Sequence, residues 1–316
     1  MTPLQHLDDR AILAARGPRN TVDPTKPNAY FVEPEPTPDG VLEDVATLLT
    51  TNAECPFRCL MCDLWRNTTP EPLEPSNVAR QVAWALDELP FTPHVKIYNA
   101  GNFFDNHAMP AVDRSRIAEL MKQRSTLVVE CHPKLIDQRC VDYARSLAPV
   151  KLQVAMGLET VDPDVVPRLN KRMTLDDYAR ATELLLEHGV NVRAFILVRT
   201  PFQSETEGAD WAMRSIDYAF SIGVECCVVI PTRVGNGIME QLEQQGSFHP
   251  PSIRSVERVL EYGLRLGRGR VFADLWDIER FYDCPACGSS RAERLKQMNL
   301  TQTYFETVVC SCERTP

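Results

Sequence analysis

The sequence predicts an α/β fold built on a parallel sheet, and two observations carry this prediction. Six short runs rich in β-branched and other apolar residues begin at residues 46, 94, 125, 150, 191 and 224. Segments of helix length, with apolar residues near helical spacing, lie between them. This alternation is typical of a parallel sheet, either open and doubly wound or curled into a partial barrel of six strand-helix units. In both folds, ligands bind beyond the carboxyl ends of the strands.

The size and composition of the chain suit one large domain with additions. Its 316 residues are 44% hydrophobic and 24% charged, enough to bury a sizeable core. Its apolar runs fall short of the roughly 20 residues that cross a bilayer, and the N-terminus lacks the apolar segment of a secretory signal. We therefore expect a cytoplasmic protein without a membrane partner. The formal net charge of −9 argues against a surface that is basic throughout, so nucleic acid binding is neither supported nor excluded.

We expect three parts along the chain. Residues 1–45 are predicted to form an N-terminal arm, because the prolines and polar residues clustered at 21–40 favour an extended, loop-like segment over packed regular structure. Residues 46–233 contain the six strand-helix units and are predicted to form the core. Residues 234–316 are predicted to form a C-terminal extension.

Three cysteines follow the first predicted strand. Cys55, Cys59 and Cys62 have the spacing C-x3-C-x2-C. Three thiolates on a short loop can hold three corners of a cubane [4Fe-4S] cluster and leave one iron open for chemistry. On spacing alone, a zinc site or three unrelated thiols fits about as well. A reducing compartment would keep these thiols available as metal ligands.

Polar residues stand at the ends of the second and third predicted strands. The second strand runs into Asn99, Ala100, Gly101 and Asn102, where the glycine would let the backbone approach a ligand closely. The third ends in Glu130, a carboxylate that needs a partner if it is buried in an apolar strand. A plain turn and a solvated strand end are the alternatives.

The fourth predicted strand is followed by a second charged stretch. Glu159 lies just past the strand, and Arg172 lies one short helix later. An arginine guanidinium forks well onto a carboxylate. Arg168 and Lys171 are alternatives for the same role, and a solvated basic helix end is the structural alternative.

The triplet and these strand ends resemble the radical S-adenosylmethionine (SAM) superfamily. The stretch MGLETVDPDVVPRLNKRMT also resembles the segment after the fourth strand in coproporphyrinogen-dehydrogenase-like, methylthiotransferase-like and Elongator-like members. The resemblance implies a partial (β/α)6 TIM-like barrel and a catalytic [4Fe-4S] cluster on Cys55, Cys59 and Cys62. It also implies that SAM occupies the open iron and is reductively cleaved to a 5'-deoxyadenosyl radical, which abstracts a substrate hydrogen.

The same resemblance implies the residues that contact SAM. The backbone of Asn99 to Asn102 would meet the SAM amino group, although the family's stretch here is richer in glycine. Glu130 and Glu159 would contact the ribose or nearby groups, and Arg172 would pair with the SAM carboxylate. Two further contacts are Met61, which stands where an aromatic residue commonly lies against adenine, and Pro231 on the sixth strand.

Within the superfamily, the stretches NAGNFFD and ECHP resemble the archaeosine synthase radical SAM subunit and its uncharacterised bacterial relatives. That resemblance implies cleavage of a carbon-nitrogen bond in a lysine-modified deazaguanine of tRNA. It further implies an electron donor such as flavodoxin or ferredoxin. The chemistry class transfers more readily than the substrate, because fold and superfamily do not fix the substrate.

Four more cysteines form two tight pairs near the C-terminus. Cys284 and Cys287 have the spacing C-x2-C, and Cys310 and Cys312 have the spacing C-x-C. Four thiols suit a closed tetrahedral Zn²⁺ site, and the CPACG stretch is typical of a zinc-ribbon knuckle. A second iron-sulfur cluster uses the same ligands.

Two alternative functions remain open at this level. One is a zinc-binding adaptor protein whose thiols hold only structural metal and which catalyses nothing. The other is a non-radical α/β barrel enzyme. Iron content would separate the first from a radical SAM enzyme, and survival of activity in a Cys59→Ala variant would favour the second.

Overall fold

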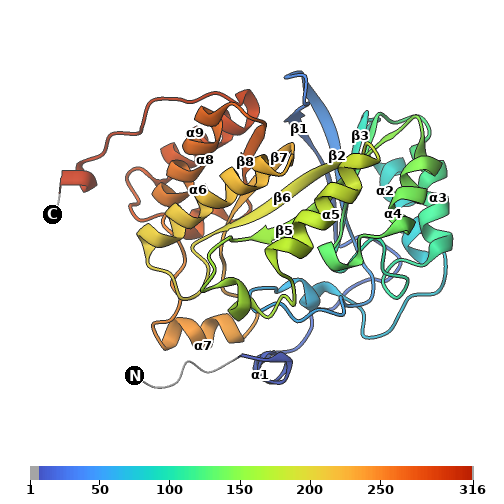
Figure 1. Cartoon of the computed structure of the whole chain (residues 1–316), viewed down its shortest axis with the longest axis horizontal. Coiled ribbons are helices and arrows are strands. Elements are labelled where there is room, and N and C mark those ends of the chain that lie inside the picture. Colours follow the sequence, from blue (N-terminus) through green and yellow to red (C-terminus); the bar gives the residue numbers. More distant parts are fainter. Residues whose placement is uncertain (1–6, 315–316) are drawn as a thin grey trace.

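The computed structural model describes residues 7–314, and there the chain forms one eight-stranded sheet in the order β1 to β8 (Figure 1). The strands are β1 Ala29–Pro36, β2 Leu42–Thr50, β3 His94–Asn99, β4 Thr126–Glu130, β5 Lys151–Glu159, β6 Asn191–Val198, β7 Cys226–Pro231 and β8 Arg270–Ala273. The α-helices are α1 Asp9–Ala15, α2 Asn77–Glu88, α3 Ala111–Met121, α4 Gln138–Leu147, α5 Leu175–Glu187, α6 Glu205–Ser221, α7 Ile238–Gln244, α8 Ile253–Leu266 and α9 Gly288–Thr301. Short 3₁₀ helices are η1 Leu64–Asn67, η2 Pro133–Leu135, η3 Val166–Leu169, η4 Ile278–Phe281 and η5 Ser311–Arg314.

The six predicted strands and the five helices between them are confirmed as β2 to β7 and α2 to α6. Strands β2 to β8 are parallel neighbours, and the sheet curls so that helices cover its outer face (Figure 1). The architecture is therefore the predicted partial barrel, with one strand added at each edge. The carboxyl ends of the parallel strands lie at one end of it, next to the loop that carries Cys55, Cys59 and Cys62.

Alternation along each strand separates the helix-packed core from the barrel interior. On β3, Val95 and Ile97 are buried in the core under the helices, whereas Lys96 and Tyr98 face the interior cavity. Successive side chains of a strand point to opposite faces, so one strand supplies both environments. Cys226 and Cys227 on β7 follow the same rule, and of the two only Cys227 belongs to the main helix-packed cluster.

The expectation of a loop-like N-terminal arm is wrong for two segments. Residues 9–15 form α1, whose first turn is capped by the Asp8 side chain accepting from Ala11 N at 2.9 Å. Residues 29–36 form β1, which pairs antiparallel with β2. The prolines at 34 and 36 suggested a loop, but an edge strand tolerates proline because half of its backbone N–H groups have no ladder partner. Residues 1–6 of the predicted arm lie outside the described residues.

The sheet also continues past residue 233, where the predicted core ends. Strand β8 pairs in parallel with β7. The outer edge of β8 is covered by two side chains, one from Asn299 in α9 and one from Gln302, the residue that caps the end of α9. Asn299 hydrogen-bonds to N and O of Ala273, and Gln302 hydrogen-bonds to N and O of Val271, all at 2.8–2.9 Å. An exposed strand edge invites pairing with other chains, and these side-chain amides occupy it.

The two edge strands are also joined to each other. Arg270 on β8 donates to the Pro36 carbonyl on β1 at 2.7 Å and pairs with Glu35 at 3.3 Å. Glu35 also forms ion pairs with Lys96 on β3 and with Arg193 on β6, each at 2.5 Å. This cluster closes the amino-terminal end of the barrel, opposite the cysteine loop.

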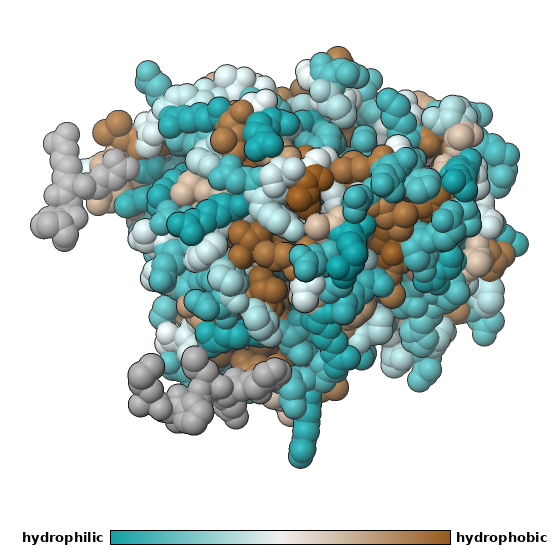
Figure 2. All heavy atoms as spheres, viewed as in Figure 1, coloured by the Kyte–Doolittle hydropathy of each residue, from teal (hydrophilic) through white to brown (hydrophobic). Residues whose placement is uncertain are grey.

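None of the helices within residues 7–314 is long and apolar enough to cross a bilayer. Figure 2 shows a face on which hydrophilic residues predominate and hydrophobic residues form small separate groups.

Candidate cluster and SAM site

A cavity of about 870 Å³ opens inside the barrel and at the carboxyl ends of its strands. Most of the site residues predicted from the sequence line it: Cys59, Met61, Cys62, Asn99, Ala100, Gly101, Asn102, Glu130, Glu159 and Pro231. Ligand pockets of proteins commonly measure about 300–1,000 Å³, so the volume is large enough for a cofactor with a second small molecule beside it.

The cysteine loop is fixed by contacts from three other parts of the chain. Asn102 donates from Nδ2 to Cys55 Sγ at 3.1 Å. Asn236, in the loop after β7, donates from Nδ2 to the carbonyls of Leu60 at 2.7 Å and Cys62 at 3.2 Å. The Leu60 amide in turn bonds a carbonyl in η3 at 2.8 Å. The two glycines that flank Asn236 fit a flexible loop lying against adenine or substrate, and the contacts of Asn236 with the cysteine loop were not predicted from the sequence.

The donor set on this loop suits a metal cluster. Burial raises the pKa of Cys55, raises that of Cys59 to about 12, and raises that of Cys62 well above its ordinary value. A thiol in such surroundings becomes a thiolate when a metal ion supplies compensating positive charge. Three sulfur donors, two of which line the open cavity, fit a [4Fe-4S] cluster that leaves one iron without a cysteine ligand.

Unpartnered polar groups point to a ligand at the end of β3. Asn99 is buried at 1% exposure, and its Nδ2 and Oδ1 have no hydrogen-bond partner among the residues that the structure describes. Buried amide atoms are almost always hydrogen-bonded in folded proteins. Asn99 therefore supports a polar ligand group here, as the predicted SAM contact requires.

Glu130 lies in the same cavity at the end of β4. It forms no ion pair within residues 7–314, and burial raises its pKa well above the usual value for a glutamate. A carboxyl in this state donates a hydrogen bond, or becomes ionised when a cationic ligand arrives. Either form can hold a ribose hydroxyl.

Glu159 forms a buried ion pair with Lys171 in the cavity wall. Burial alone would lower the pKa of Lys171, but the Glu159 carboxylate raises it above its ordinary value. Gly157 makes room for the pair, because a Cβ at that position would collide with the Glu159 carboxylate and the Lys171 ammonium. Glu159 itself has a left-handed backbone, with φ of 65°, at a register shift between β5 and β6.

Arg172 lies outside the cavity lining. Its guanidinium pairs with Asp9 near the start of the chain, and its side chain is 55% exposed. Asn170 and Arg172 both have positive φ, at 48° and 55°, so the chain turns Lys171 inward and Arg172 outward. The asparagine was the one sequence signal for this turn. The contact predicted for Arg172 stays a prediction, and the geometry favours Lys171 as the cation beside Cys59.

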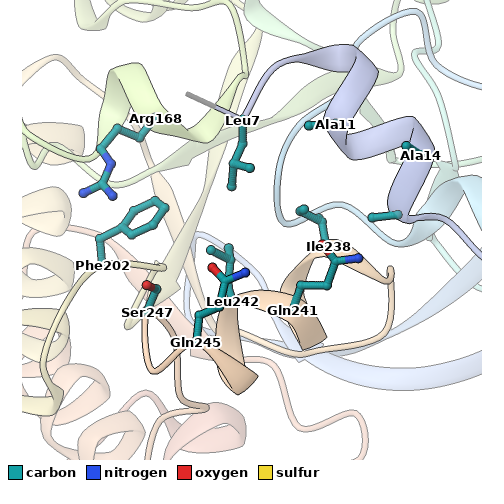
Figure 3. Close-up of a pocket in the computed structure, with 11 residues that line it drawn as sticks. Leu7, Ala11, Ala14, Arg168, Phe202, Ile238, Gln241, Leu242, Gln245 and Ser247 are labelled. Carbon is teal, nitrogen blue, oxygen red and sulfur yellow. The ribbon is translucent and has the colours of Figure 1, made fainter. Parts of the chain in front are cut away.

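Arg168, the other alternative, faces a smaller cavity of about 290 Å³ between α1 and α7. Figure 3 shows its guanidinium beside Phe202, and its Cζ lies 3.2 Å from the centroid of that ring. Arg199, the residue directly after β6, pairs with Glu205 at 2.5 Å and donates to the Pro250 carbonyl at 2.9 Å. Neither arginine lines the large cavity.

His132 joins the cysteine loop to Lys171, a role that the ECHP motif did not reveal. Its ring stacks on Phe57 with centroids 3.7 Å apart and planes at 9°. Its Nδ1 accepts from Lys134 N at 3.2 Å, which leaves Nε2 to donate to the Lys171 carbonyl at 3.0 Å. Burial and then the nearby Lys171 charge lower the pKa of His132 to about 3, so the ring is neutral.

The rest of the cavity combines aromatic walls with charged groups. Rings come from β1, β3, β6, β8 and the loop after β8, at Phe31, Tyr98, Phe195, Phe272 and Trp276. Tyr98 and Phe195 meet edge to face, with centroids 5.9 Å apart. Planar ligands stack on such surfaces. Trp276 is 59% exposed and stands at the mouth.

A second group of cysteines lies outside this cavity. The Sγ atoms of Cys284, Cys287, Cys310 and Cys312 all lie within 4.8 Å of one another. The predicted C-terminal metal group is therefore assembled in space, although its two halves are separated by α9.

Comparison with known proteins identifies the class. The model of the radical SAM superfamily matches residues 50–212, about half of the chain. The chain belongs to the radical SAM superfamily, and this membership implies a [4Fe-4S] cluster and SAM as its cofactors.

Individual relatives are similar to this chain at low sequence identity. Archaeosine synthase subunit beta of Methanosarcina acetivorans is 26% identical over 297 residues, which cover 87% of this chain and 84% of that protein. The protein of the same description from Thermococcus kodakarensis is 28% identical over 54% of each chain. Among solved structures, the Methanocaldococcus infernus Elp3 with an N-terminal deletion matches with a TM-score of 0.54 and 14% identity, over 81% of this chain and 63% of that one. The structural match shows a shared fold.

Proposed function

We propose that this radical SAM enzyme breaks a carbon-nitrogen bond in a modified deazaguanine base carried by tRNA. The observation that carries the proposal is the similarity to archaeosine synthase subunit beta, which extends over 87% of the chain. Aromatic side chains from both ends of the chain line the cavity, and planar rings stack on such side chains. This lining is further evidence for a substrate with a planar ring. The superfamily match speaks against a zinc adaptor and a non-radical enzyme.

The proposed roles of the residues follow from their positions. Cys55, Cys59 and Cys62 would hold the cluster, and Asn236 would keep their loop in place. Asn99, together with the ion pair of Glu159 and Lys171, would orient SAM beside the open iron. A reduced cluster on these cysteines would supply the electron that cleaves SAM to methionine and a 5'-deoxyadenosyl radical.

The barrel itself would protect that chemistry. A network of ion pairs closes one end of the cavity and consists of Glu35, Lys96, Arg193 and Arg270. The aromatic rings line the sides of the cavity. Excluding water prevents side reactions of a reactive intermediate. An external reductant, such as flavodoxin or ferredoxin, would deliver the electron. The name of the relatives, a subunit beta, further supports a second subunit as a partner.

The experiment is anaerobic reconstitution with iron and sulfide, followed by dithionite, SAM and one candidate substrate. The candidates are tRNA carrying a lysine-modified deazaguanine, the same base as a free molecule, and unmodified tRNA. We expect 5'-deoxyadenosine and a cleaved base only with the modified tRNA. Formation of 5'-deoxyadenosine without cleavage of any candidate would reject the substrate, whereas its absence in every reaction would reject SAM cleavage by this chain.

Two cysteine variants calibrate the assay. Cys59→Ala removes a predicted cluster ligand and should abolish formation of 5'-deoxyadenosine. Cys140→Ala removes a buried thiol of α4 that packs in the core away from the cavity, and it should retain activity. Equal losses in both variants would show that the effect comes from folding and not from the cluster.

A further inference from the structure

We infer that Cys284, Cys287, Cys310 and Cys312 bind a single Zn²⁺ ion, and that this ion fastens the C-terminal segment and α9 to the open edge of the barrel. The site is separate from the cluster on the loop after β2 and does not depend on the proposed reaction. The sequence left zinc and a second iron-sulfur cluster open, and the distances between the sulfur atoms decide between them.

The sulfur spacing fits one ion. The Sγ atoms of Cys287 and Cys312 are 3.8 Å apart, and all four Sγ atoms lie within 4.8 Å of one another. A tetrahedron with zinc-sulfur bonds of about 2.3 Å has sulfur-sulfur edges of about 3.8 Å. A cubane cluster would hold its cysteine sulfurs farther apart, because four irons and four sulfides lie between them.

The surroundings supply the charge that such a site needs. Four thiolates around Zn²⁺ carry two net negative charges. Arg254 donates from Nη2 to Cys312 Sγ at 3.0 Å, and Arg291 donates from Nε to Cys287 Sγ at 3.4 Å. Outer groups that bond the ligands orient them and strengthen metal binding. A knuckle turn, with Gly288 N bonding the Cys284 carbonyl at 2.9 Å, places the first pair at the start of α9.

The C-terminal segment needs this anchor because little else buries it. Residues 303–309 are mostly exposed, and Val309 is 83% exposed. Two arginines of α9 hold its backbone: Arg294 bonds the Phe305 and Glu306 carbonyls, and Arg291 bonds the Val308 carbonyl. With so little apolar surface removed from water, metal binding becomes the main source of its stability.

The ion therefore acts at a distance on the sheet. Helix α9 begins at the first cysteine pair and ends at the side chains that cover the edge of β8, Asn299 and Gln302. Asn299 also lines the large cavity. Leu295 and Met298 hold the middle of α9 in the core, so losing the ion would free the segment, loosen the start of α9 and weaken the cover over the edge of β8.

Metal analysis of two reciprocal variants tests the assignment. In Cys55→Ala/Cys59→Ala/Cys62→Ala, purified without reconstitution, we expect one zinc per chain and neither iron nor sulfide. In Cys310→Ser/Cys312→Ser, reconstituted, we expect the zinc to be lost and the iron of the first site to be retained. Ser311→Ala, which changes the residue between the two cysteines, should keep its zinc. Iron in place of zinc in the triple variant, or the absence of any metal there, would overturn the proposal.

Two further measurements test the role and cover variants that fail to fold. Hydrogen exchange should speed up at least tenfold in α9 and β8 of Cys310→Ser/Cys312→Ser relative to Ser311→Ala, and unchanged exchange would refute the fastening role. Wild-type protein produced with Co²⁺ should show the intense visible bands of tetrahedral cobalt bound to four thiolates. A spectrum of octahedral cobalt would refute the four-sulfur site. If these measurements reject the zinc site, the proposal that this chain cleaves SAM still stands, because it rests on the separate cysteine loop after β2. The two proposals can therefore fail independently.

Discussion

Glu159 and Lys171 show how much the site depends on single residues. They form an ion pair in the cavity wall, next to Cys59, and Gly157 leaves the space that they occupy. The sequence indicated the glutamate through its place at a strand end. The sequence did not show which basic residue pairs with Glu159. The direction in which each residue of an irregular turn points depends on the backbone angles, which the sequence pattern does not specify.

We predict that Lys171→Met impairs SAM binding far more than Arg172→Met. Lys171 faces the cavity and neutralises Glu159, whereas Arg172 pairs with Asp9 outside it. Hydrogen bonds to charged groups contribute about 1.5–3 kcal/mol, so Lys171→Met should weaken SAM affinity roughly 10- to 150-fold and Arg172→Met less than about threefold. Calorimetric titration of the reconstituted variants with SAM measures both. A larger loss for Arg172→Met would restore the prediction made from the sequence.

Gly157→Ala should also weaken SAM binding while the protein stays folded. The added methyl group would meet the ends of two flexible side chains, which can move aside at the cost of their pairing. We expect a loss of about tenfold in SAM affinity with a fall of about 1 kcal/mol in the free energy of unfolding. Gly17→Ala is the matched control, because a Cβ there would have no atom within 4 Å from the other described residues, its two chain neighbours aside. Equal SAM affinity in the two variants would show that the pair does not serve SAM.

At the scale of elements, β1 does more than extend the sheet. Its Glu35 joins it to Lys96 on β3, Arg193 on β6 and Arg270 on β8. Burial opposes the charge on this carboxylate, but Arg193 and Lys96 outweigh burial and hold the pKa of Glu35 well below its usual range. The edge strand thereby closes the barrel at the end away from the cysteines.

Glu35→Gln should reduce stability, and the reduction should depend on pH. Removing one partner from a buried charge network costs about 3–5 kcal/mol. A carboxylate with a lowered folded pKa stabilises the fold above its unfolded pKa, near 4.5, and the benefit is lost as the pH falls below that value. The difference between wild type and variant should therefore be constant from pH 7 to about 5.5 and shrink by up to about 1.4 kcal/mol per unit below 4.5.

Urea unfolding across that pH range measures the difference for Glu35→Gln. Glu33→Gln is the control on the same strand, because the Glu33 side chain is 43% exposed and should contribute much less. A gap between wild type and Glu35→Gln that is the same at pH 7 and pH 4 would contradict the assigned charge state.

At the scale of the whole molecule, the cavity is built by both ends of the chain. Strand β1 contributes Phe31, the central strands contribute Tyr98 and Phe195, and the segment after β8 contributes Trp276 at the mouth. The predicted core of residues 46–233 holds the predicted cluster and SAM contacts but lacks part of this wall. This wall of the cavity therefore depends on segments that the sequence pattern placed outside the core.

Trp276→Ala should separate substrate binding from SAM cleavage. The indole is exposed at the mouth, away from the cysteine loop, so the slow formation of 5'-deoxyadenosine without substrate should be unchanged. Stacking of a base on an aromatic ring contributes about 1–3 kcal/mol, so KM for the base substrate should rise roughly 5- to 150-fold. Trp276→Phe should recover most of the loss. Phe91→Ala, at another exposed aromatic residue before β3, should leave KM unchanged, and an equal effect there would argue against a specific contact.

By itself, the sequence determined the strand-helix alternation, the partial barrel and the cysteine triplet, because these depend on local periodicity and short spacing. It also located Asn99, Glu130 and Glu159, since the carboxyl ends of parallel strands converge. Only the tertiary structure shows that Lys171 points inward, that β1 is a strand despite its prolines, and that the Sγ atoms of Cys284 and Cys312 lie within 4.8 Å of each other. These outcomes depend on backbone angles and on pairing between separate segments of the chain, and the periodicity and spacing of the sequence do not specify either.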